Sequence, residues 1–416
     1  MKPISIVCAV LMSVLLISYV GKAGAGVISS SSTASLSSIA FPSYNTNPPA
    51  ADMTGMPSTA VGIASKIKLG WNAGNTLEAI GGETSWGNPE ISEELIRLVK
   101  QSGFNAIRLP TAWDQYANQQ TAKINADWLN RINTIVQYCV DNDVYVIVNI
   151  HWDGGWLENH VSLEKQQENN AKQKAFWEQI ATRLRDFDEH LLFASANEPN
   201  VKTSEQMAVL LSYHQTFVDA VRSTGGKNAY RVLIVQGPET DIEKTNELMS
   251  KMPIDTVANR LMTEIHFYTP YNFAGLTKDE SWGKMFYYWG KKFHSSKDPA
   301  RNATWGEEEK VDQLLHLMKV KFVDKGIPVI VGEFGAERRD NLSGDALTLH
   351  LASRAHYLKY VTKQSIANGL VPFYWDNGSL KNFGSGIFDR KTNSVFDQQS
   401  LDALVQGATE SKKTTN

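Results

Sequence analysis

The chain has 416 residues, of which 42% are hydrophobic and 20% charged, so it is long enough to bury a large apolar core. Its 41 Lys and Arg side chains stand against 44 Asp and Glu side chains, for a net charge of −3, and the sequence contains no basic run. This balance excludes a strongly electropositive surface, so no nucleic-acid partner is expected. With only two cysteines, Cys8 and Cys139, the chain cannot be held by a disulfide framework.

Residues 1–25 have the pattern of a secretory signal peptide. Lys2 precedes an almost unbroken apolar run, residues 4–20, and Ala23-Gly24-Ala25 match a cleavage site. The alternative is an uncleaved N-terminal anchor. No other stretch approaches the roughly 20 consecutive apolar residues that a membrane-spanning helix needs. The mature protein is therefore expected to be secreted to the extracellular space or the periplasm, with no membrane attachment after signal cleavage.

Composition also divides the rest of the chain. Residues 26–60 are rich in Ser, Thr, Pro, Ala and Asn without periodicity, which predicts a flexible N-terminal segment. Residues 409–416 are polar and predict a disordered tail. No internal repeat and no second apolar core is evident, so residues 61–408 are predicted to form a single domain.

Within residues 61–408, short β-branched runs alternate with longer amphipathic segments. The predicted strands are 67–71, 106–109, 144–150, 191–196, 232–235, 261–267, 329–332 and 371–375. The predicted helices between them include 92–102, 126–142, 204–223, 307–325 and 348–368. Apolar strands separated by helices form a parallel sheet covered by helices, and eight such units predict a (β/α)8 TIM barrel. The competing fold is an open doubly wound sheet, but no glycine-rich phosphate loop follows the first strand.

Two glutamates each end an apolar run where a strand stops. Glu198 follows Leu-Leu-Phe-Ala-Ser-Ala-Asn, and Glu333 follows Pro-Val-Ile-Val-Gly. Burying a carboxylate without compensation is strongly unfavourable, so a glutamate in this position indicates a function or a specific partner. Their separation places them at the fourth and seventh strands, facing each other across the mouth of the barrel. Two such carboxylates are what hydrolysis of a glycosidic bond requires.

The other strand ends supply further polar and aromatic side chains. In a (β/α)8 barrel the reactive groups lie at the C-terminal ends of the strands, so these positions predict the rest of the site. The strand ends hold Trp71-Asn72, Arg108, His151-Trp152, Asn197-Glu198, Gln236, His266-Phe267-Tyr268, Glu333 and Trp375-Asp376-Asn377.

Taken in chain order, these motifs resemble glycoside hydrolase family 5, the cellulase family, over residues 66–404. Asn-Glu-Pro at 197–199 matches its acid/base motif, and Gly-Glu-Phe at 332–334 matches its nucleophile strand. The resemblance implies that the substrate-binding residues are Arg108, His151, Asn197, His266, Tyr268 and Trp375. Gly-Trp-Asn-Ala-Gly-Asn-Thr-Leu at 70–77 and Glu-Thr-Ser-Trp-Gly-Asn-Pro at 83–89 look like its endoglucanase branches. Those branches more often have Leu where Ala73 stands, and His or Glu where Trp152 and Asp153 stand. The departures leave the mechanism alone but leave the subfamily and the glycan open.

The residue types suit retaining hydrolysis, in which one carboxylic acid protonates the leaving oxygen and one carboxylate attacks the anomeric carbon, about 5–5.5 Å away. Glu198 is the expected acid/base, kept protonated by the neighbouring carboxylate and by partial burial. Glu333 is the expected nucleophile, kept ionised by Arg108 and by a hydrogen bond from Tyr268. Asn197 is expected to bind the sugar 2-hydroxyl group.

Each role has a structural alternative. Both glutamates could be structural carboxylates paired with arginine, and Arg108 could be a structural ion-pair partner. Trp375 offers a flat apolar face to a sugar ring, but it could also be core packing. His151 and His266 could be core histidines or metal ligands, although their spacing fits no helical zinc motif and no cysteine joins them. No metal and no cofactor is therefore expected.

The sequence thus predicts a secreted, monomeric, retaining endo-β-1,4-glucanase that cuts cellulose, mixed-linkage β-glucan or related chains internally. The enzymatic alternative is the same machinery acting on xyloglucan or mannan. A non-catalytic carbohydrate-binding barrel is a different class, and the two glutamates argue against it because a lectin needs neither. A metal-dependent barrel hydrolase is a further alternative.

Overall fold

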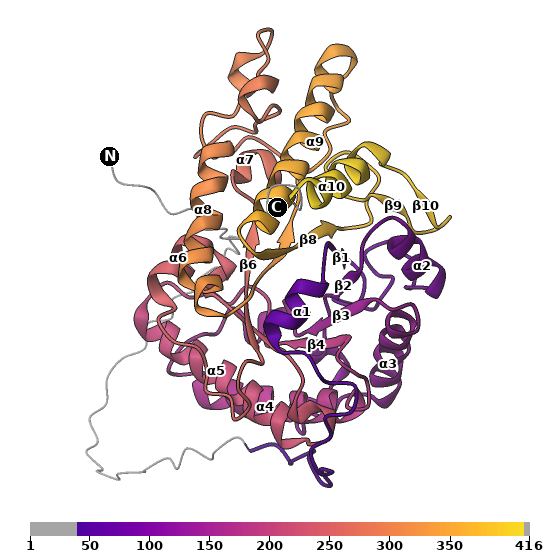
Figure 1. Cartoon of the computed structure of the whole chain (residues 1–416), viewed down its shortest axis with the longest axis vertical. Helices are drawn as coiled ribbons and strands as arrows, with labels where there is room; N and C mark the ends of the chain where they lie inside the picture. Colours follow the sequence, from indigo (N-terminus) through magenta and orange to yellow (C-terminus); the bar gives the residue numbers. More distant parts are fainter. Residues whose placement is uncertain (1–39, 412–416) are drawn as a thin grey trace, which may run out of the picture. The chain divides into compact units, whose positions relative to one another are not determined.

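The computed structural model describes residues 40–411, and at their centre lies a closed barrel of eight parallel strands (Figure 1). Each strand pairs with the next along the chain, and β8 pairs with β1 to close the ring. The strands are β1 (Gly70–Ala73), β2 (Ala106–Leu109), β3 (Tyr145–Asn149), β4 (Leu191–Ala194), β5 (Leu233–Gln236), β6 (Leu261–Phe267), β7 (Val329–Phe334) and β8 (Leu370–Asp376). The predicted (β/α)8 barrel is confirmed, and the strand ends differ from the prediction by at most three residues.

The helices lie mostly outside the barrel, and α3, α4, α5 and α6 follow one another around it in Figure 1. Hydrogen bonds from backbone N–H groups to the side chains of Ser92 and Thr203 mark the starts of α2 and α5. The helices are α1 (Ala60–Lys66), α2 (Glu93–Gln101), α3 (Ala126–Asp141), α4 (Gln166–Arg183), α5 (Ser204–Ser223), α6 (Ile242–Leu248), α7 (Tyr271–Ala274), α8 (Glu308–Lys321), α9 (Gly344–Ala367) and α10 (Gln398–Glu410). All five helices expected from the periodicity are present.

The inside of the barrel changes from apolar to polar along the strands. Ala106, Ile147 and Met262 belong to the apolar cluster inside the barrel. Because side chains two residues apart point to the same face of a strand, the next inward positions are two residues further on. These positions hold Arg108, Asn149 and Glu264. The polar site therefore rests on a packed apolar floor at the C-terminal ends of the strands.

The segment before α1 is ordered against the barrel from residue 40 onward. The Tyr44 backbone N–H donates to Glu178 of α4 at 2.7 Å, and its hydroxyl donates to the Thr121 carbonyl at 2.7 Å. Ala51 forms a parallel β-bridge with Gly226. The predicted flexible segment, residues 26–60, is therefore wrong for residues 40–60, because backbone groups and helix side chains bind this stretch despite its composition. Similarly, the predicted tail begins too early, since α10 runs to residue 410.

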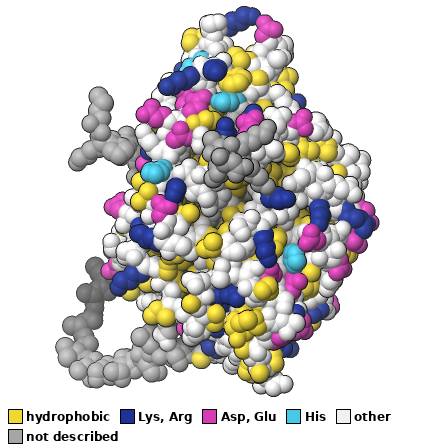
Figure 2. Space-filling model, in the orientation of Figure 1, with side chains coloured by type: hydrophobic (Ala, Val, Ile, Leu, Met, Phe, Trp, Pro, Cys, Tyr) yellow, Lys and Arg dark blue, Asp and Glu magenta, His cyan; other side chains and the backbone are white. Residues whose placement is uncertain are grey.

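The predicted signal peptide, residues 26–39 and residues 412–416 lie outside the described residues. Among the residues that are described, no helix is both long enough and apolar enough to cross a membrane. On the face of the molecule in Figure 2, Lys and Arg side chains are scattered among Asp and Glu side chains.

Candidate active site

The structure brings the eight predicted site residues to the C-terminal ends of the strands. Four of them lie within strands: Arg108 in β2, His266 in β6, Glu333 in β7 and Trp375 in β8. The other four lie just past strand ends: His151 after β3, Asn197 and Glu198 after β4, and Tyr268 after β6. The two glutamates occupy the fourth and seventh βα units, as predicted.

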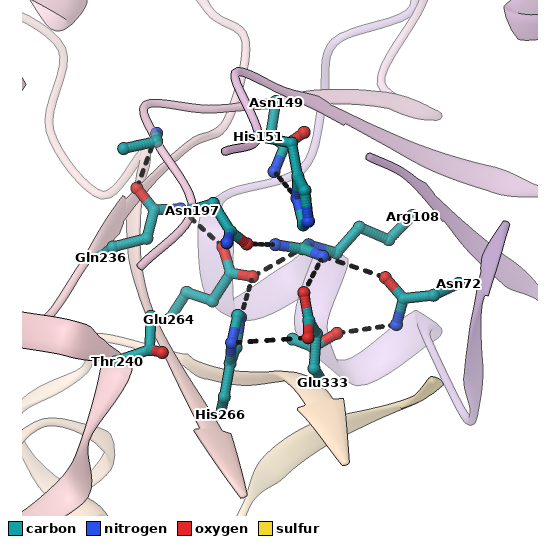
Figure 3. A network of polar contacts seen from close by, with 12 residues as sticks. Asn72, Arg108, Asn149, His151, Asn197, Gln236, Thr240, Glu264, His266 and Glu333 are labelled. Carbon is teal, nitrogen blue, oxygen red and sulfur yellow. Dashed lines mark hydrogen bonds and ion pairs between the residues drawn. The ribbon is translucent and has the colours of Figure 1, made fainter. Parts of the chain in front are cut away.

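Arg108 lies at the centre of the site and is fully buried (Figure 3). Its Nη1 donates to Glu333 Oε1 at 2.8 Å and to Asn72 Oδ1 at 3.0 Å, and its Nη2 donates to Asn197 Oδ1 at 2.9 Å. Its Nε lies 3.0 Å from Glu264 Oε1. Burial lowers the pKa of Arg108, but the two carboxylates raise it above its usual value. The arginine is therefore both a structural ion-pair partner and a contact of the predicted nucleophile.

Glu333 is held by hydrogen bonds to both carboxylate oxygens. Arg108 donates to Oε1, and the Tyr268 hydroxyl donates to Oε2 at 2.9 Å. The glutamate is only 6% exposed. Burial and the charge of Glu333 raise the pKa of Tyr268 well above its usual value, so the phenol keeps its proton and acts as a donor. These contacts hold the Glu333 carboxylate in a fixed orientation.

His266 links Glu198 to a second buried carboxylate. Its Nδ1 lies 2.6 Å from Glu198 Oε1, and its Nε2 lies 3.3 Å from Glu264 Oε1. Burial lowers the pKa of His266, but Glu333, Glu198 and Glu264 raise it to about 10. The ring is therefore an imidazolium at neutral pH, and both nitrogens donate. The Glu198 side chain is 40% exposed, so it faces the open side of the site.

The distance between the two predicted catalytic carboxylates suits a retaining enzyme. One oxygen of Glu198 and one oxygen of Glu333 lie within 4.8 Å of each other. Carboxyl groups of retaining glycosidases lie about 5–5.5 Å apart, whereas inverting enzymes need about 6.5–9.5 Å to admit a water molecule. The observed separation is therefore that of the retaining class.

Asn197 is oriented by a cation on one side and a carboxylate on the other. Its Oδ1 accepts from Arg108, so its Nδ2 is the donor, and this Nδ2 lies 3.4 Å from Glu158 Oε2. Nδ2 carries a second hydrogen that remains for a ligand. That hydrogen suits the oxygen of a sugar hydroxyl group.

His151 and Trp375 form a stacked aromatic pair. Their rings are nearly parallel, 7° apart, with centroids separated by 5.9 Å. The Asn149 amide donates to His151 Nδ1 at 3.3 Å, because Asn149 Oδ1 already accepts from Thr111 N. Burial and the cations Arg108 and His266 lower the pKa of His151 well below its usual value, so the ring is neutral. The imidazole Nε2–H is then a neutral donor beside the tryptophan.

Sequence reasoning missed two buried glutamates of this site. Glu264 lies two residues before His266 in β6, so strand alternation could have placed both side chains on the inner face. Although burial raises it, Arg108 and His266 bring the pKa of Glu264 below its usual value. Glu158 lies in the loop after β3, where no periodic signal points to it.

Glu198, His266 and Glu333 are also the set of side chains, within the described residues, whose geometry could offer three ligand atoms to a metal ion. His266 does not suit this role, because both of its nitrogens donate to carboxylates and an imidazolium has no free lone pair. The donor set therefore fits acid–base chemistry better than metal binding.

Comparisons with known proteins agree with this geometry. The family model Cellulase (glycosyl hydrolase family 5) matches residues 71–381. A xyloglucan-specific endo-beta-1,4-glucanase of Bacteroides ovatus is 38% identical over 376 residues, covering 86% of this chain and 72% of that protein. Endoglucanase A of Paenibacillus barcinonensis is 37% identical over 397 residues, covering 89% of this chain and 95% of that protein.

A solved structure gives the same result. A family 5 xyloglucan-specific beta-1,4-glucanase from a ruminal metagenomic library, in complex with XXLG, superposes with a TM-score of 0.79. It is 35% identical in sequence, and the alignment covers 85% of this chain and 96% of that one. The match extends over most of the barrel that carries the paired glutamates. The chain therefore belongs to glycoside hydrolase family 5 and is a glycoside hydrolase of its endo-β-1,4-glucanase group.

Proposed function

We propose that the chain cleaves internal β-1,4-glucosidic bonds by double displacement, with Glu333 as nucleophile and Glu198 as acid/base. The observation that supports this most directly is the approach of the two carboxylates to within 4.8 Å, in different surroundings. Glu333 is buried and held by two donors, as a nucleophile requires. Glu198 is partly exposed and can reach both a leaving group and water.

In the first step Glu333 attacks the anomeric carbon and forms a glycosyl ester, while Glu198 protonates the departing sugar oxygen. His266 donates to Glu198 Oε1, so the transferable proton belongs on the other oxygen, Oε2. In the second step Glu198 removes a proton from water, which attacks the same carbon and releases Glu333. Two inversions retain the β configuration. Asn197 Nδ2 binds the 2-hydroxyl group, and Trp375 stacks against the ring next to the cleaved bond.

The substrate proposed for this chemistry is the β-1,4-glucan backbone of xyloglucan, with linear β-glucans as the second candidate. The two similar proteins named as xyloglucan-specific support the first choice. The relative named endoglucanase A supports the second. The order of preference differs from the one that the sequence motifs alone suggested, in which cellulose came first.

We also propose that the protein acts outside the cytoplasm as a monomer. The leader-like residues 1–25 support export. The monomer is supported by the amphipathic pattern of the helices, because packing within a single barrel accounts for their apolar faces. Its partner would be a β-glucan polysaccharide and not a nucleic acid.

A hydrolysis panel tests this proposal. Purified protein is incubated with xyloglucan, carboxymethylcellulose, barley β-glucan and glucomannan, and the reducing ends are followed together with the fall in viscosity. Xyloglucan should give the highest kcat/KM, with an early fall in viscosity and β-anomers in the first NMR spectra. Activity should survive EDTA. Initial α-anomers, or no cleavage of any glucan, would contradict the proposal.

A further inference from the structure

A third carboxylate, Glu158, lies next to the backbone of the predicted acid/base, and no step of the proposed mechanism uses it. It is 9% exposed and sits in the loop between β3 and α4. Its Oε2 accepts from the Glu198 backbone N–H at 3.0 Å and faces Asn197 Nδ2 at 3.4 Å. Its own carbonyl accepts from Asn200 N at 2.9 Å. Glu158 therefore holds the peptide on both sides of Glu198.

We propose that Glu158 is a positioning residue for the acid/base step, which fixes the Asn197–Glu198 peptide and forms with Glu198 a coupled pair of carboxyl groups. The inference rests on the proposed function, since it concerns the proton that Glu198 delivers to the leaving group. It adds a role for a residue that does not itself touch the reacting atoms.

Glu158 helps to orient both Asn197 and Glu198. Asn197 must present Nδ2, not Oδ1, to a sugar hydroxyl oxygen. Arg108 fixes the position of Oδ1 by donating to it, and Glu158 fixes the position of Nδ2 by accepting from it. The same carboxylate fixes the backbone of Glu198, whose side chain accepts from His266. Losing this acceptor would leave two buried donors without a partner.

Glu158 also interacts electrostatically with the carboxylates of the site. Glu158 has no cation within ion-pair distance among residues 40–411, and the charged groups that face it are Glu198 on the β4 loop and Glu333 in β7. The site's cations, Arg108 and His266, contact other residues. Burial and the charge of Glu198 raise the pKa of Glu158 to about 8. Glu158 and Glu198 therefore repel each other when both are ionised.

Repulsion of this kind makes a pair keep its last proton to higher pH than either group would alone. The protonated form of Glu198, which the first step needs, is one of the two forms of that singly protonated pair. A neutral side chain at position 158 would remove the repulsion. The site would then lose its last carboxyl proton at lower pH, and the acid-catalysed step would fail earlier on the alkaline side.

The test compares Glu158→Gln, which keeps an acceptor oxygen but cannot ionise, with the unchanged enzyme on a polysaccharide substrate. In Glu158→Gln, the alkaline limb of the pH profile of kcat/KM should move to lower pH by at least about one unit, and the acid limb should not move. Glu158→Ala, which also loses the acceptor, should have a lower kcat at every pH. Glu178→Gln is the matched control, because Glu178 is a buried glutamate of α4 that binds Tyr44 outside the site. It should leave the profile unchanged.

Superimposable pH profiles for Glu158→Gln and the unchanged enzyme would overturn the proposal. So would an equal loss at every pH accompanied by a lower Tm, which indicates a structural role only. If Glu158→Gln does not fold, the carboxyl carbons of glutamate-labelled protein are titrated by NMR instead. The glutamate that titrates highest must move to lower pH in Glu198→Gln, and an unmoved resonance overturns the proposal. An enzyme that cleaves glucans while failing these tests refutes this inference but not the proposed function.

Discussion

Glu198 and Glu333 face the same space but differ in what surrounds them. Glu333 is buried and accepts charge-assisted hydrogen bonds from Arg108 and Tyr268, one on each carboxylate oxygen. Glu198 has a 40% exposed side chain, and one of its oxygens is bound by His266. The first environment fixes both oxygens of the carboxylate, and the second leaves one oxygen of Glu198 accessible to a substrate and to water.

Replacing Glu333 by Ala should lower kcat by at least about three orders of magnitude, because no glycosyl ester can form. The Tm should stay close to that of the unchanged protein, which shows that the fold persists. Added azide should then attack the anomeric carbon in place of the glutamate and give an α-glycosyl azide. Turnover at the original rate would contradict the nucleophile assignment.

Replacing Glu198 by Ala should affect substrates according to their leaving groups. A glucan leaves as a sugar alcohol and needs the proton, so its hydrolysis should almost stop. An aryl glycoside with an acidic phenol leaves without that proton, so a burst of phenol should precede slow turnover. Mass spectrometry should find the sugar on Glu333, and azide should release a β-glycosyl azide. If the burst occurs in Glu333→Ala instead, the two roles are exchanged.

Tyr268→Phe tests the support of the nucleophile without changing the packing. Hydrogen bonds to charged groups contribute about 1.5–3 kcal/mol, so kcat should fall about tenfold or more while the Tm changes little. Tyr357→Phe provides a control, because that buried hydroxyl contacts the Thr269 carbonyl at 3.3 Å, away from the two glutamates. Equal activity of Tyr268→Phe and the unchanged enzyme would remove the tyrosine from the mechanism.

At the scale of an element, a buried side chain of β6 restricts which residue can occupy one position of β7. A Cβ atom at Gly332 would lie 1.9 Å from Glu264 Oε1, whereas one at Gly335 would meet its nearest neighbour at 3.6 Å. Gly332 is therefore required by the close approach of the buried carboxylate that pairs with Arg108 and His266. Gly335 has no such constraint, although it lies only three residues along the same chain segment.

Gly332→Ala should therefore damage the site, and Gly335→Ala should not. The added methyl group at position 332 has to displace Glu264, which would disturb Arg108 and, through it, Glu333. We expect kcat/KM to fall at least about tenfold. The Tm should fall by several degrees, because overpacking a core costs about 1–3 kcal/mol. Equal Tm and kcat/KM values for the two variants would show that β7 relaxes to accommodate the methyl group.

At the scale of the whole molecule, the long connection between β6 and β7 is fastened to α9 by a buried histidine. His350 Nδ1 donates to the Tyr287 carbonyl at 2.8 Å, and its Nε2 accepts from Arg339 N at 3.1 Å. Both contacts require a neutral ring. Burial lowers the pKa of His350 to about 3, with further lowering from Arg339 and Arg354.

This arrangement predicts a loss of stability in acid. The folded-state pKa lies below that of the unfolded chain, about 6.5, so the unfolded state binds the proton first. The free energy of unfolding should fall as the pH drops from about 6.5 toward 3, by up to about 1.4 kcal/mol per unit for this group. Urea unfolding of the unchanged protein and of His350→Gln at several pH values measures this. The variant should be less stable at pH 7 but show a shallower slope, and equal slopes would exclude His350 as a cause.

The sequence by itself determined the barrel and most of the site. Apolar runs of strand length, separated by amphipathic helices, are local features, and a helix between parallel strands leaves few alternatives to a barrel. Because the C-terminal ends of all the strands meet at one face, reading off the residue at each end was enough to find Arg108, His266, Glu333 and Trp375.

Tertiary structure alone decided how these groups are paired. Glu264 and Glu158 have no motif of their own, and their importance depends on Arg108 and on the Glu198 backbone, which are distant from them in sequence. The order of residues 40–60 likewise depends on partners on α4 and beyond, although the composition of this segment resembles that of a linker. Local patterns report burial and backbone preference, whereas charges and pKa values depend on which groups the closed barrel brings within a few ångströms of one another.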